Sequence, residues 1–243
     1  MTLSILLPTR RIGDRSVWGD LRVTLASIEA YAPGIEVVVG WNGDAKPERL
    51  PFAFDTPARV VKQPDGIASA GAAWNWCATL TGADEFIIMS DDVVLHPDSV
   101  QLLLDDVASC KKLFRVGFVG ARSNYVKGPQ NIRSSNGAKT VAIKFDSEDL
   151  ILQSDMVAPI CAWVSREAFE SVGGFPDCDW FSDDVICWDM VQKGLRHLVS
   201  RAYVHHIGQR ATGIAQGKNS ETLLREGLEW VRNNRPDFAA AML

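Results

Sequence analysis

The sequence predicts an α/β protein whose centre is a Rossmann-like, mostly parallel sheet flanked by helices. Short apolar runs bounded by turn residues alternate along the chain with segments whose apolar residues recur at helical spacing. Such alternation is typical of βαβ units, in which each helix returns the chain to the start of the next parallel strand. The 243 residues are 47% hydrophobic and 23% charged. This ordinary globular composition excludes disordered, collagen-like and coiled-coil proteins.

The first half of the chain carries most of the predicted alternation. The expected strands are apolar runs followed by turn signals: Leu3–Leu7, Ile35–Val39, Arg59–Lys62, Phe86–Met89 and Val116–Val119. The expected helices have apolar residues three or four positions apart, and they contain Val17–Ile28, Ile67–Leu80 and Val100–Val107. We expect Pro8 to stop the first strand, and Asp98 to cap the helix that follows Pro97.

The second half begins with a loop rich in Gly, Asn and Ser, from Asn124 to Lys139. Mixed strands follow, with a helix near Glu167–Val172, a helix after Asp184 and a strand over Leu198–Val204. The last predicted element is a helix, and its expected apolar face combines three residues: Leu224, Leu228 and Val231.

Charge and cysteine content restrict the class of protein. The formal net charge is −5, so the chain lacks the basic surface of a general nucleic-acid binder. Its five cysteines form no C-x-x-C motif, which predicts buried, reduced thiols and argues against zinc. The N-terminal apolar run has no preceding basic residues, and no apolar stretch approaches 18 residues. We therefore expect a cytoplasmic protein without a membrane span.

Polar residues follow several of the predicted strands, where open α/β sheets bind their ligands. Asp91 and Asp92 come directly after the strand Phe86–Met89. Two adjacent carboxylates repel each other, and a divalent cation between them and a substrate would relieve that repulsion. A turn without a ligand is the alternative. The predicted strands also place Pro8-Thr9-Arg10 and Trp41-Asn42-Gly43-Asp44 at this edge of the sheet.

Two further motifs lie in the second half. Asp183 and Asp184 precede an apolar helical run, where a carboxylate acts either as a general base or as a partner of the helix dipole. His205 and His206 end a predicted strand and must point to opposite faces, so at most one of them serves a given site. Basic side chains near the Gly/Asn/Ser-rich loop either approach a phosphate or are solvated: Arg122, Lys127 and Arg133.

The ordered set of motifs resembles glycosyltransferase family 2, the inverting nucleotide-sugar enzymes of GT-A fold. Six segments carry the resemblance, each similar to a motif of that family: Leu7-Pro8-Thr9-Arg10, Glu36–Val39 with the turn Asn42-Gly43-Asp44, Phe86–Pro97 with its D-x-D-like centre, Ala162–Phe175, the Asp183-Asp184 pair and His205-His206-Ile207-Gly208. Ser90 departs from the family at the first D-x-D position, and Trp41-Asn42 stands where the family usually has an aspartate that contacts the nucleobase.

The resemblance implies that the chain moves a sugar, with inversion, from a nucleotide-diphosphate donor to an acceptor hydroxyl. It implies a Mn²⁺ or Mg²⁺ site made by Asp92, Asp91 and His206. It makes Asp184 the general base, with Asp183 as the alternative. Donor-binding residues are expected near the strand ends: Pro8, Thr9, Arg10, Asn42, Asp44, Asp65 and Asp91. Trp41 is a candidate for stacking on the base. Trp180 and Trp163 precede the predicted base in sequence and either contact the acceptor or pack in the core.

The implied organisation is one GT-A domain over residues 1–243. Residues 1–120 would bind the nucleotide sugar, and residues 121–243 would bind the acceptor with a smaller mixed sheet and the C-terminal helix. Two alternatives stay open: a non-catalytic module that binds a nucleotide sugar or glycan, which Ser90 would suit, and a sugar nucleotidyltransferase, for which residues 8–13 are poor in glycine. The acceptor class also stays open among glycans, lipid-linked sugars, proteins and modified nucleic acids.

Overall fold

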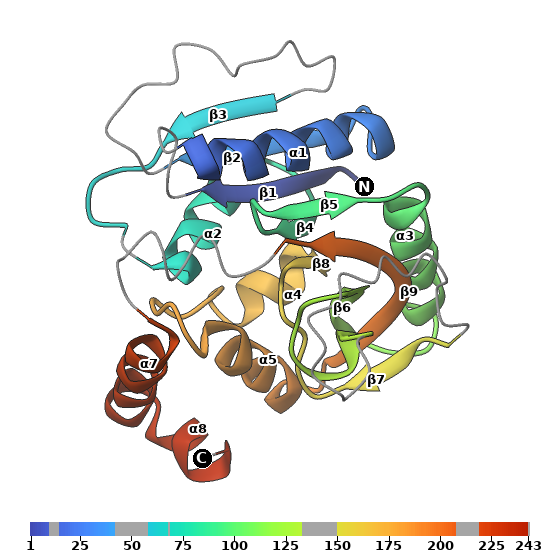
Figure 1. Ribbon diagram of the computed structural model, residues 1–243. Helices are drawn as coiled ribbons and strands as arrows, with labels where there is room; N and C mark the ends of the chain where they lie inside the picture. Colours follow the sequence, from blue (N-terminus) through green and yellow to red (C-terminus); the bar gives the residue numbers. More distant parts are fainter. Residues whose placement is uncertain (10–14, 42–57, 68, 133–149, 208–218, 243) are drawn as a thin grey trace.

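A nine-stranded sheet runs through the computed structural model, which describes residues 1–9, 15–41, 58–67, 69–132, 150–207 and 219–242 (Figure 1). The strand order is β3-β2-β1-β4-β8-β6-β9-β5, and β7 also pairs with β9. The first four strands in this order are parallel to one another, as predicted: β3 (Ala58–Lys62), β2 (Glu36–Trp41), β1 (Leu3–Thr9) and β4 (Glu85–Met89).

The remainder of the sheet is mixed and continues directly from β4. Strand β8 (Cys161–Ser165) is antiparallel to both β4 and β6 (Val116–Ser123), and β6 is parallel to β9 (Arg196–His206). Two three-residue strands, β5 (Val93–Leu95) and β7 (Leu152–Ser154), pair antiparallel with β9. They were not predicted, because three residues are too few to show a strand period.

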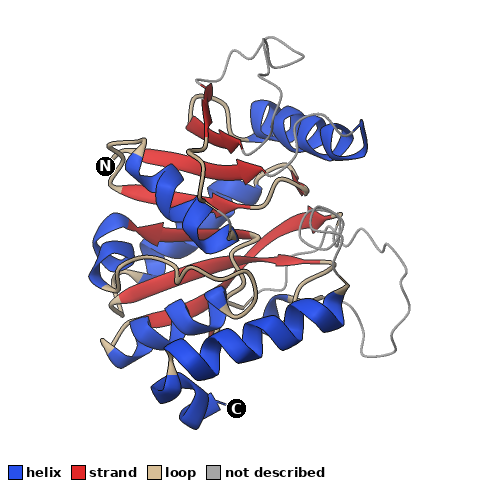
Figure 2. Ribbon diagram, turned by 90° about the vertical axis from the view of Figure 1, so that its left-hand side faces the viewer, coloured by secondary structure: helices blue, strands red, loops and turns tan. Residues whose placement is uncertain are grey.

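Helices cover both faces of the sheet, as Figures 1 and 2 show. Alternate strand residues point to opposite faces, so Ile5 and Leu7 pack under one layer while Leu6 packs under the other. The first layer contains α1 (Arg15–Tyr31) and α3 (Ser99–Cys110). The second contains α2 (Ala70–Thr79), α4 (Arg166–Ser171) and α5 (Ser182–Gln192). Each buried Leu, Ile or Phe contributes about 1.5–3 kcal/mol, so the two cores hold the strand ends in register.

The C-terminal helices lie against the outer side of α5. Helices α7 (Ser220–Asn234) and α8 (Pro236–Met242) form a small apolar cluster with α5 through Val231 and Phe238. The predicted apolar face of α7 was partly wrong, since Leu224 is 40% exposed and the buried residues are Leu223, Gly227 and Val231. The physical reason is the close approach at the glycine, where an added Cβ would lie 2.9 Å from the Cβ of Trp180.

Pro8 does not stop the first strand, contrary to the prediction. Strand β1 continues to Thr9, and Pro8 lies opposite Gly40 of β2. Pairing of β1 with β4 ends at Leu6, so Pro8 has a neighbouring strand on one side only. A proline is tolerated there because the missing N–H is not needed by a second neighbour. The extra length carries Thr9 to the edge of the sheet where Asp91 lies.

Asp98 occupies the N-cap position of α3, but its side chain makes no capping hydrogen bond. Its φ of 64° lies in the left-handed region, whereas a capping side chain needs an extended backbone. Ser99 orders this turn instead: its hydroxyl accepts from the backbone N–H of His96 and donates to the carbonyl of His96.

All five cysteines are buried and none forms a disulfide, which agrees with the predicted buried thiols. In the described part of the chain, no helix combines the length and the apolar character that a membrane span requires.

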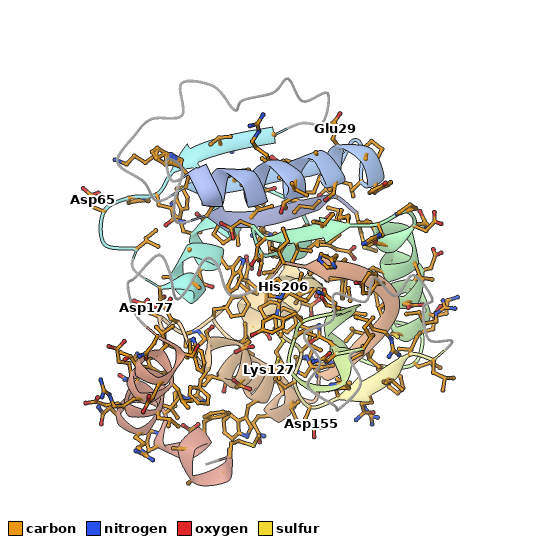
Figure 3. The ribbon with its side chains drawn as sticks, in the orientation of Figure 1. Glu29, Asp65, Lys127, Asp155, Asp177 and His206 are labelled. Carbon is orange, nitrogen blue, oxygen red and sulfur yellow. The ribbon has the colours of Figure 1, made fainter. Side chains whose placement is uncertain are left out.

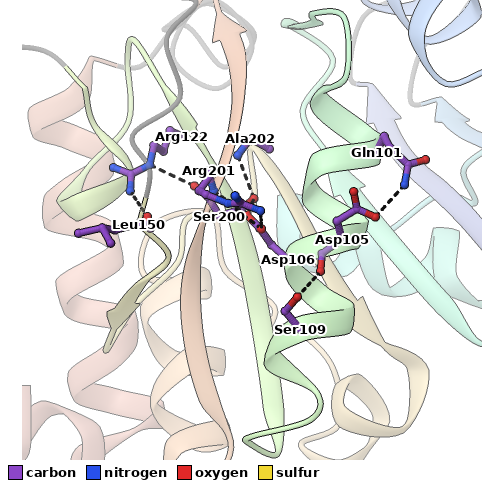
Figure 4. Close-up of polar contacts among 9 residues, drawn as sticks. All are labelled: Gln101, Asp105, Asp106, Ser109, Arg122, Leu150, Ser200, Arg201 and Ala202. Carbon is purple, nitrogen blue, oxygen red and sulfur yellow. Dashed lines mark hydrogen bonds and ion pairs between the residues drawn. The ribbon is translucent and has the colours of Figure 1, made fainter.

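Asp106 of α3 is fully buried and fastens that helix to β9 (Figure 4). One carboxylate oxygen accepts from the Ser200 hydroxyl at 2.7 Å and from the Arg201 backbone N–H at 2.8 Å. The other accepts from the Arg201 guanidinium at 2.5 and 2.9 Å. The network holds the irregular part of β9, where its register with β6 shifts.

We predict that Asp106→Ala lowers the free energy of unfolding by about 3 kcal/mol, at the low end of the range for broken buried ion pairs. The low end applies because the Arg201 side chain is partly exposed and can reach water. Urea unfolding of both proteins measures the loss. The matched control is Asp105→Ala, which removes only an exposed hydrogen bond from Gln101 on the same helix (Figure 4). A loss below about 1 kcal/mol for Asp106→Ala would contradict the assigned role.

His197 of β9 is buried in its neutral form. Its Nδ1 accepts from the Phe118 backbone N–H at 3.0 Å, and its Nε2 donates to the Cys187 carbonyl at 2.9 Å. Burial lowers the pKa of this imidazole below its ordinary value. A second ring proton would point at the Phe118 N–H, so the folded state resists protonation.

Because the folded-state pKa of His197 lies below the unfolded one, its contribution to stability is complete above about pH 6.5 and is lost as the pH falls. We expect the wild type to lose up to about 1.4 kcal/mol more than His197→Gln between pH 7.5 and 5.5. Urea unfolding of both proteins across this range measures the difference. The comparison cancels the other three histidines, including His206, whose raised pKa acts in the opposite direction. Equal slopes for the two proteins would refute the prediction.

Candidate functional site

The carboxyl ends of β1 and β4 bring two of the predicted residues together. Asp91 follows β4 and is buried, and its carboxylate accepts a hydrogen bond from the Thr9 hydroxyl at 2.6 Å. Its backbone carbonyl accepts from the Thr24 hydroxyl of α1 at 2.9 Å. Asp91 is therefore held by the strand and the helix on either side of it, at the edge where open α/β sheets bind ligands.

Asp92 meets His206, as the metal prediction requires. The two side chains approach to 3.1 Å between Asp92 Oδ1 and His206 Nε2. Pairing of β5 with the end of β9 places them, because Val93 lies opposite His206 and the Ile207 N–H donates to the Asp92 carbonyl at 2.9 Å. Burial alone would lower the pKa of His206, but the hydrogen bond to Asp92 and its charge outweigh that effect and raise the pKa.

The His206 ring is oriented from its far side. Its Nδ1 lies 2.5 Å from the Tyr125 carbonyl, which can only accept, so Nδ1 carries a proton. The backbone of His206 exchanges two hydrogen bonds with the Asn124 side chain, at 2.7 and 3.1 Å. Because the carbonyl holds Nδ1, Nε2 is the ring nitrogen that faces Asp92.

Asp92 and His206 fit a divalent cation as two of its ligands. An imidazole nitrogen and a carboxylate oxygen converge: the Tyr125 carbonyl holds the ring, and the Ile207 N–H holds the Asp92 backbone. Within the residues that the structure describes, no set of three or more His, Cys, Asp or Glu side chains could hold a metal alone. Substrate phosphates commonly supply the missing oxygens when a protein offers so few ligands. Asp91, the expected third ligand, accepts a hydrogen bond from the Thr9 hydroxyl through Oδ2 and does not form such a set with Asp92 and His206 among the described residues.

Asp183 and Asp184 lie in the first turn of α5, and both contact Lys127. The Lys127 ammonium is 2.7 Å from Asp184 Oδ2 and 3.1 Å from Asp183 Oδ2. Burial and the neighbouring charge of Asp183 raise the pKa of Asp184, while Lys127 acts in the opposite direction. Burial would lower the pKa of Lys127, but the two carboxylates raise it above its ordinary value, so this amine is charged.

The three basic residues near the Gly/Asn/Ser-rich loop have different surroundings. Arg122 is buried and donates to the carbonyls of Ser200 and Leu150, which makes it part of the sheet (Figure 4). Arg133 lies outside the described residues. Lys127 pairs with the two aspartates, a partnership that the sequence could not indicate because 57 residues separate Lys127 from Asp184.

The other residues predicted to bind the donor are not brought into contact with Asp91 or Asp92 by any hydrogen bond or ion pair described here. Pro8 lies in β1 beside Thr9, and Asp65 is exposed on the turn that follows β3, at the periphery in Figure 3. Arg10, Asn42 and Asp44 lie outside the described residues. Trp41 packs in the core at the end of β2 and is 1% exposed, so its ring does not offer the stacking surface that we expected.

The two tryptophans that we expected to contact the acceptor lie in different parts of the structure. Trp180 is half-buried just before α5 and lies against Gly227 of α7, close in sequence to the carboxylate pair. Trp163 is 1% exposed, and its indole N–H donates to Glu85 at the start of β4, away from the end that carries Asp92. Lys111 lies 5.1 Å from the centre of its ring. The structure therefore places Trp163 in the core rather than at the candidate site.

Gln63 is a polar residue at this edge that the sequence analysis did not single out. It follows β3, and its backbone N–H donates to the Trp41 carbonyl at 2.8 Å. Its side-chain Oε1 and the indole nitrogen of Trp41 are both buried and have no hydrogen-bond partner within the described residues. A buried glutamine has no recognisable sequence signal, because its effect depends on which strand ends surround it.

The comparisons with known proteins place this geometry in a structural context. Neither the known protein families nor the curated proteins contain a match to the sequence. Among solved structures, S. aureus TarS 1-349 in complex with UDP-GlcNAc is similar, with a TM-score of 0.62, 12% identity, and coverage of 95% of this chain and 65% of that one. Another crystal structure of S. aureus TarS 1-349 has a TM-score of 0.59 and 11% identity, with coverage of 96% of this chain and 66% of that one.

A third similar structure is GalNAc-T7 with UDP, GalNAc and Mn²⁺, with a TM-score of 0.64, 15% identity, and coverage of 88% of this chain and 45% of that one. The chain thus spans less than two thirds of the length of each of these three structures. At such low identity the similarity concerns the fold, which agrees with the sheet and helix layers described above. The chain has the GT-A fold.

Proposed function

We propose that this chain is an inverting glycosyltransferase that moves a sugar from a nucleotide-diphosphate donor to an acceptor hydroxyl. The observation that carries the proposal is the convergence of two charged pairs through one short segment. Asn124 and Tyr125 hold His206, which faces Asp92, and Lys127 of the same segment holds Asp184. Figure 3 labels His206 and Lys127 at the centre of the molecule, one below the other.

Asp92 and His206 are the proposed ligands of a Mn²⁺ or Mg²⁺ ion. When bound, such an ion stabilises the negative charge that develops on the leaving nucleoside diphosphate. Asp92 would contribute a carboxylate oxygen and His206 its Nε2, with the orientation of the ring already set by the Tyr125 carbonyl. Thr9 and Asp91 would line the donor side of this position, since their hydrogen bond joins the end of β1 to the residues that follow β4. Mn²⁺ in the GalNAc-T7 structure supports this cofactor.

Asp184 is the proposed general base, with Asp183 as the alternative. Inversion requires a carboxylate that removes the proton of the acceptor hydroxyl on the face opposite the leaving group. Asp184 suits this task because burial and Asp183 raise its pKa, which makes its carboxylate a stronger base, while its side chain remains 23% exposed. Trp180, half-buried beside α5, is the proposed apolar surface for the acceptor sugar.

We keep the proposed division of the chain into a donor half and an acceptor half. Residues 1–120 contribute Thr9, Asp91 and Asp92, and residues 121–243 contribute Lys127, His206 and the carboxylate pair. The cation position draws one ligand from each half. The division is therefore one of contributed side chains, within a single sheet.

Thermal unfolding with nucleotides tests the proposal. We would measure the melting temperature with UDP, GDP, dTDP, ADP and CMP, each with and without Mn²⁺, starting from UDP because UDP or a UDP-sugar is bound in two of the similar structures. A nucleotide at about 100 times its dissociation constant stabilises the folded state by roughly 2.7 kcal/mol. We expect one diphosphate to raise the melting temperature only when Mn²⁺ is present.

Turnover separates the proposal from its alternative. The nucleotide that binds with Mn²⁺ identifies the matching sugar nucleotide as the donor. A protein that then converts this donor into free nucleotide, with an acceptor panel or with water as acceptor, is a transferase. Binding without any turnover across that panel would favour a binding module. A folded protein whose melting temperature responds to none of the nucleotides would refute the transferase and favour a non-catalytic binding module.

A further inference from the structure

The Lys127 ammonium group occupies an unusual position for a loop lysine. It lies between two carboxylates of one helical turn, 2.7 Å from Asp184 and 3.1 Å from Asp183. Its side chain is 46% exposed, whereas those of Asp183 and Asp184 are only 18% and 23% exposed. An ion pair between an ammonium group and partly buried carboxylates is screened less by water than an ion pair on the surface.

The two aspartates need such a partner. They are adjacent in the chain and both belong to the first turn of α5, so their negative charges oppose each other. Besides Lys127, the thiols of Cys178 and Cys187 interact electrostatically with both aspartates. Burial raises the pKa of both thiols, so they remain neutral and offset none of this charge.

Lys127 is also tied to the proposed cation position through the backbone. Asn124 and Tyr125, three and two residues earlier, hold the backbone and the ring of His206. Gly128, the next residue, has a φ of 71° and begins a short 3₁₀ helix whose Gln130 is buried against the Ala121 and Ala158 carbonyls. The segment is thus fixed at both ends, which places the lysine reproducibly.

We propose that Lys127 is the positioning residue of the carboxylate pair: its ammonium group holds the Asp184 carboxylate in place and offsets the charge of Asp183. The segment from Asn124 to Lys127 then sets the distance between the base and the proposed cation. The inference deepens the proposed function and rests on it for the role of Asp184 as a base. Lys127 itself touches neither donor nor acceptor in this scheme.

The first test measures the ionisation of Asp184 without any substrate. Protein labelled with ¹³C at the aspartate side-chain carboxyls is titrated by NMR, and the Asp184 signal is identified by its loss in Asp184→Asn. We expect Lys127→Met to raise the Asp184 midpoint by about one pH unit, the lower end for removing an adjacent opposite charge. Lys127→Arg should keep the wild-type midpoint. The matched control Lys112→Met removes an exposed lysine just after α3 and should leave the Asp184 midpoint unchanged.

The second test measures turnover with the donor identified by the nucleotide screen. The acid limb of the kcat profile should move upward by the same pH unit in Lys127→Met and return in Lys127→Arg, which a merely structural role would not produce. An active wild type whose Asp184 midpoint and acid limb are unchanged in Lys127→Met would overturn the inference and leave the proposed function standing. A shifted midpoint in a folded protein without turnover on any donor would overturn the proposed function, and with it the assignment of Lys127 to a base.

Discussion

Replacing Asp184 by asparagine is expected to lower the rate of sugar transfer by about 10²–10⁴-fold, the usual contribution of a positioned general base. Asparagine has nearly the same shape but cannot take up the proton of the acceptor hydroxyl. Because Asp184 lies on α5 and does not contact Asp92 or His206 in the contacts described above, the Mn²⁺-dependent binding of the nucleotide should be retained. Steady-state transfer kinetics and the thermal shift with the nucleotide measure the two quantities on the same protein.

Asp183→Asn is the matched control for this experiment. It changes the neighbouring carboxylate, which also contacts Lys127, and it removes the repulsion that raises the pKa of Asp184. We expect a smaller loss of rate and an acid limb shifted to lower pH. If Asp183→Asn abolishes transfer while Asp184→Asn stays active, the base is Asp183 and the assignment moves by one residue.

Asp92→Asn is expected to weaken the Mn²⁺-dependent binding of the nucleotide by more than about 100-fold. Partners that only orient a metal ligand already cost 10–100-fold when they are lost, and Asp92 is one of only two proposed protein ligands. The neutral amide also removes the charge that faces His206 Nε2. Titration of the protein with the nucleotide, with and without Mn²⁺, measures the loss, and the fold is checked by urea unfolding.

The control for Asp92→Asn is Asp98→Asn. Asp98 is exposed beyond β5, and its φ of 64° suits asparagine as well as aspartate. This variant should bind the nucleotide as the wild type does. Metal dependence that is unchanged in Asp92→Asn would remove Asp92 from the cation position, and the role of His206 would have to be derived again.

Much of the fold could be predicted from the chain alone. The strands of the parallel half have apolar runs that stand out because both of their faces are buried, as Ile5, Leu6 and Leu7 illustrate. The order of the motifs also singled out Asp92, His206 and Asp184 as candidates, and their roles stay predictions. Three short elements were not predicted: the strands β5 and β7 and the helix α8. Each has too few residues to show a period, and each is stabilised by pairing with β9 or by packing on α5.

The prediction of individual side chains was weaker where two environments suit the same residue type. Trp163 and Trp180 are both aromatic and precede the carboxylate pair in sequence, yet one lies in the core and the other beside α5. The face of α7 was assigned from its leucines, whereas the glycine at position 227 decides which side approaches Trp180 and Phe181. Hydrophobicity does not record how closely two backbones approach.

The sequence by itself determined the alternation of strands and helices, the two acidic pairs and the histidine at the end of a strand, because these depend on local periodicity and residue type. Only the tertiary structure decided that Asp92 faces His206, that Thr9 holds Asp91 and that Lys127 joins Asp183 and Asp184. These contacts connect residues 56–114 positions apart. The first two arise where strand ends converge on one edge of the sheet, and the third where the segment before Gly128 meets the first turn of α5. Both meetings are set by the packing of the two cores rather than by any neighbouring residues in the chain.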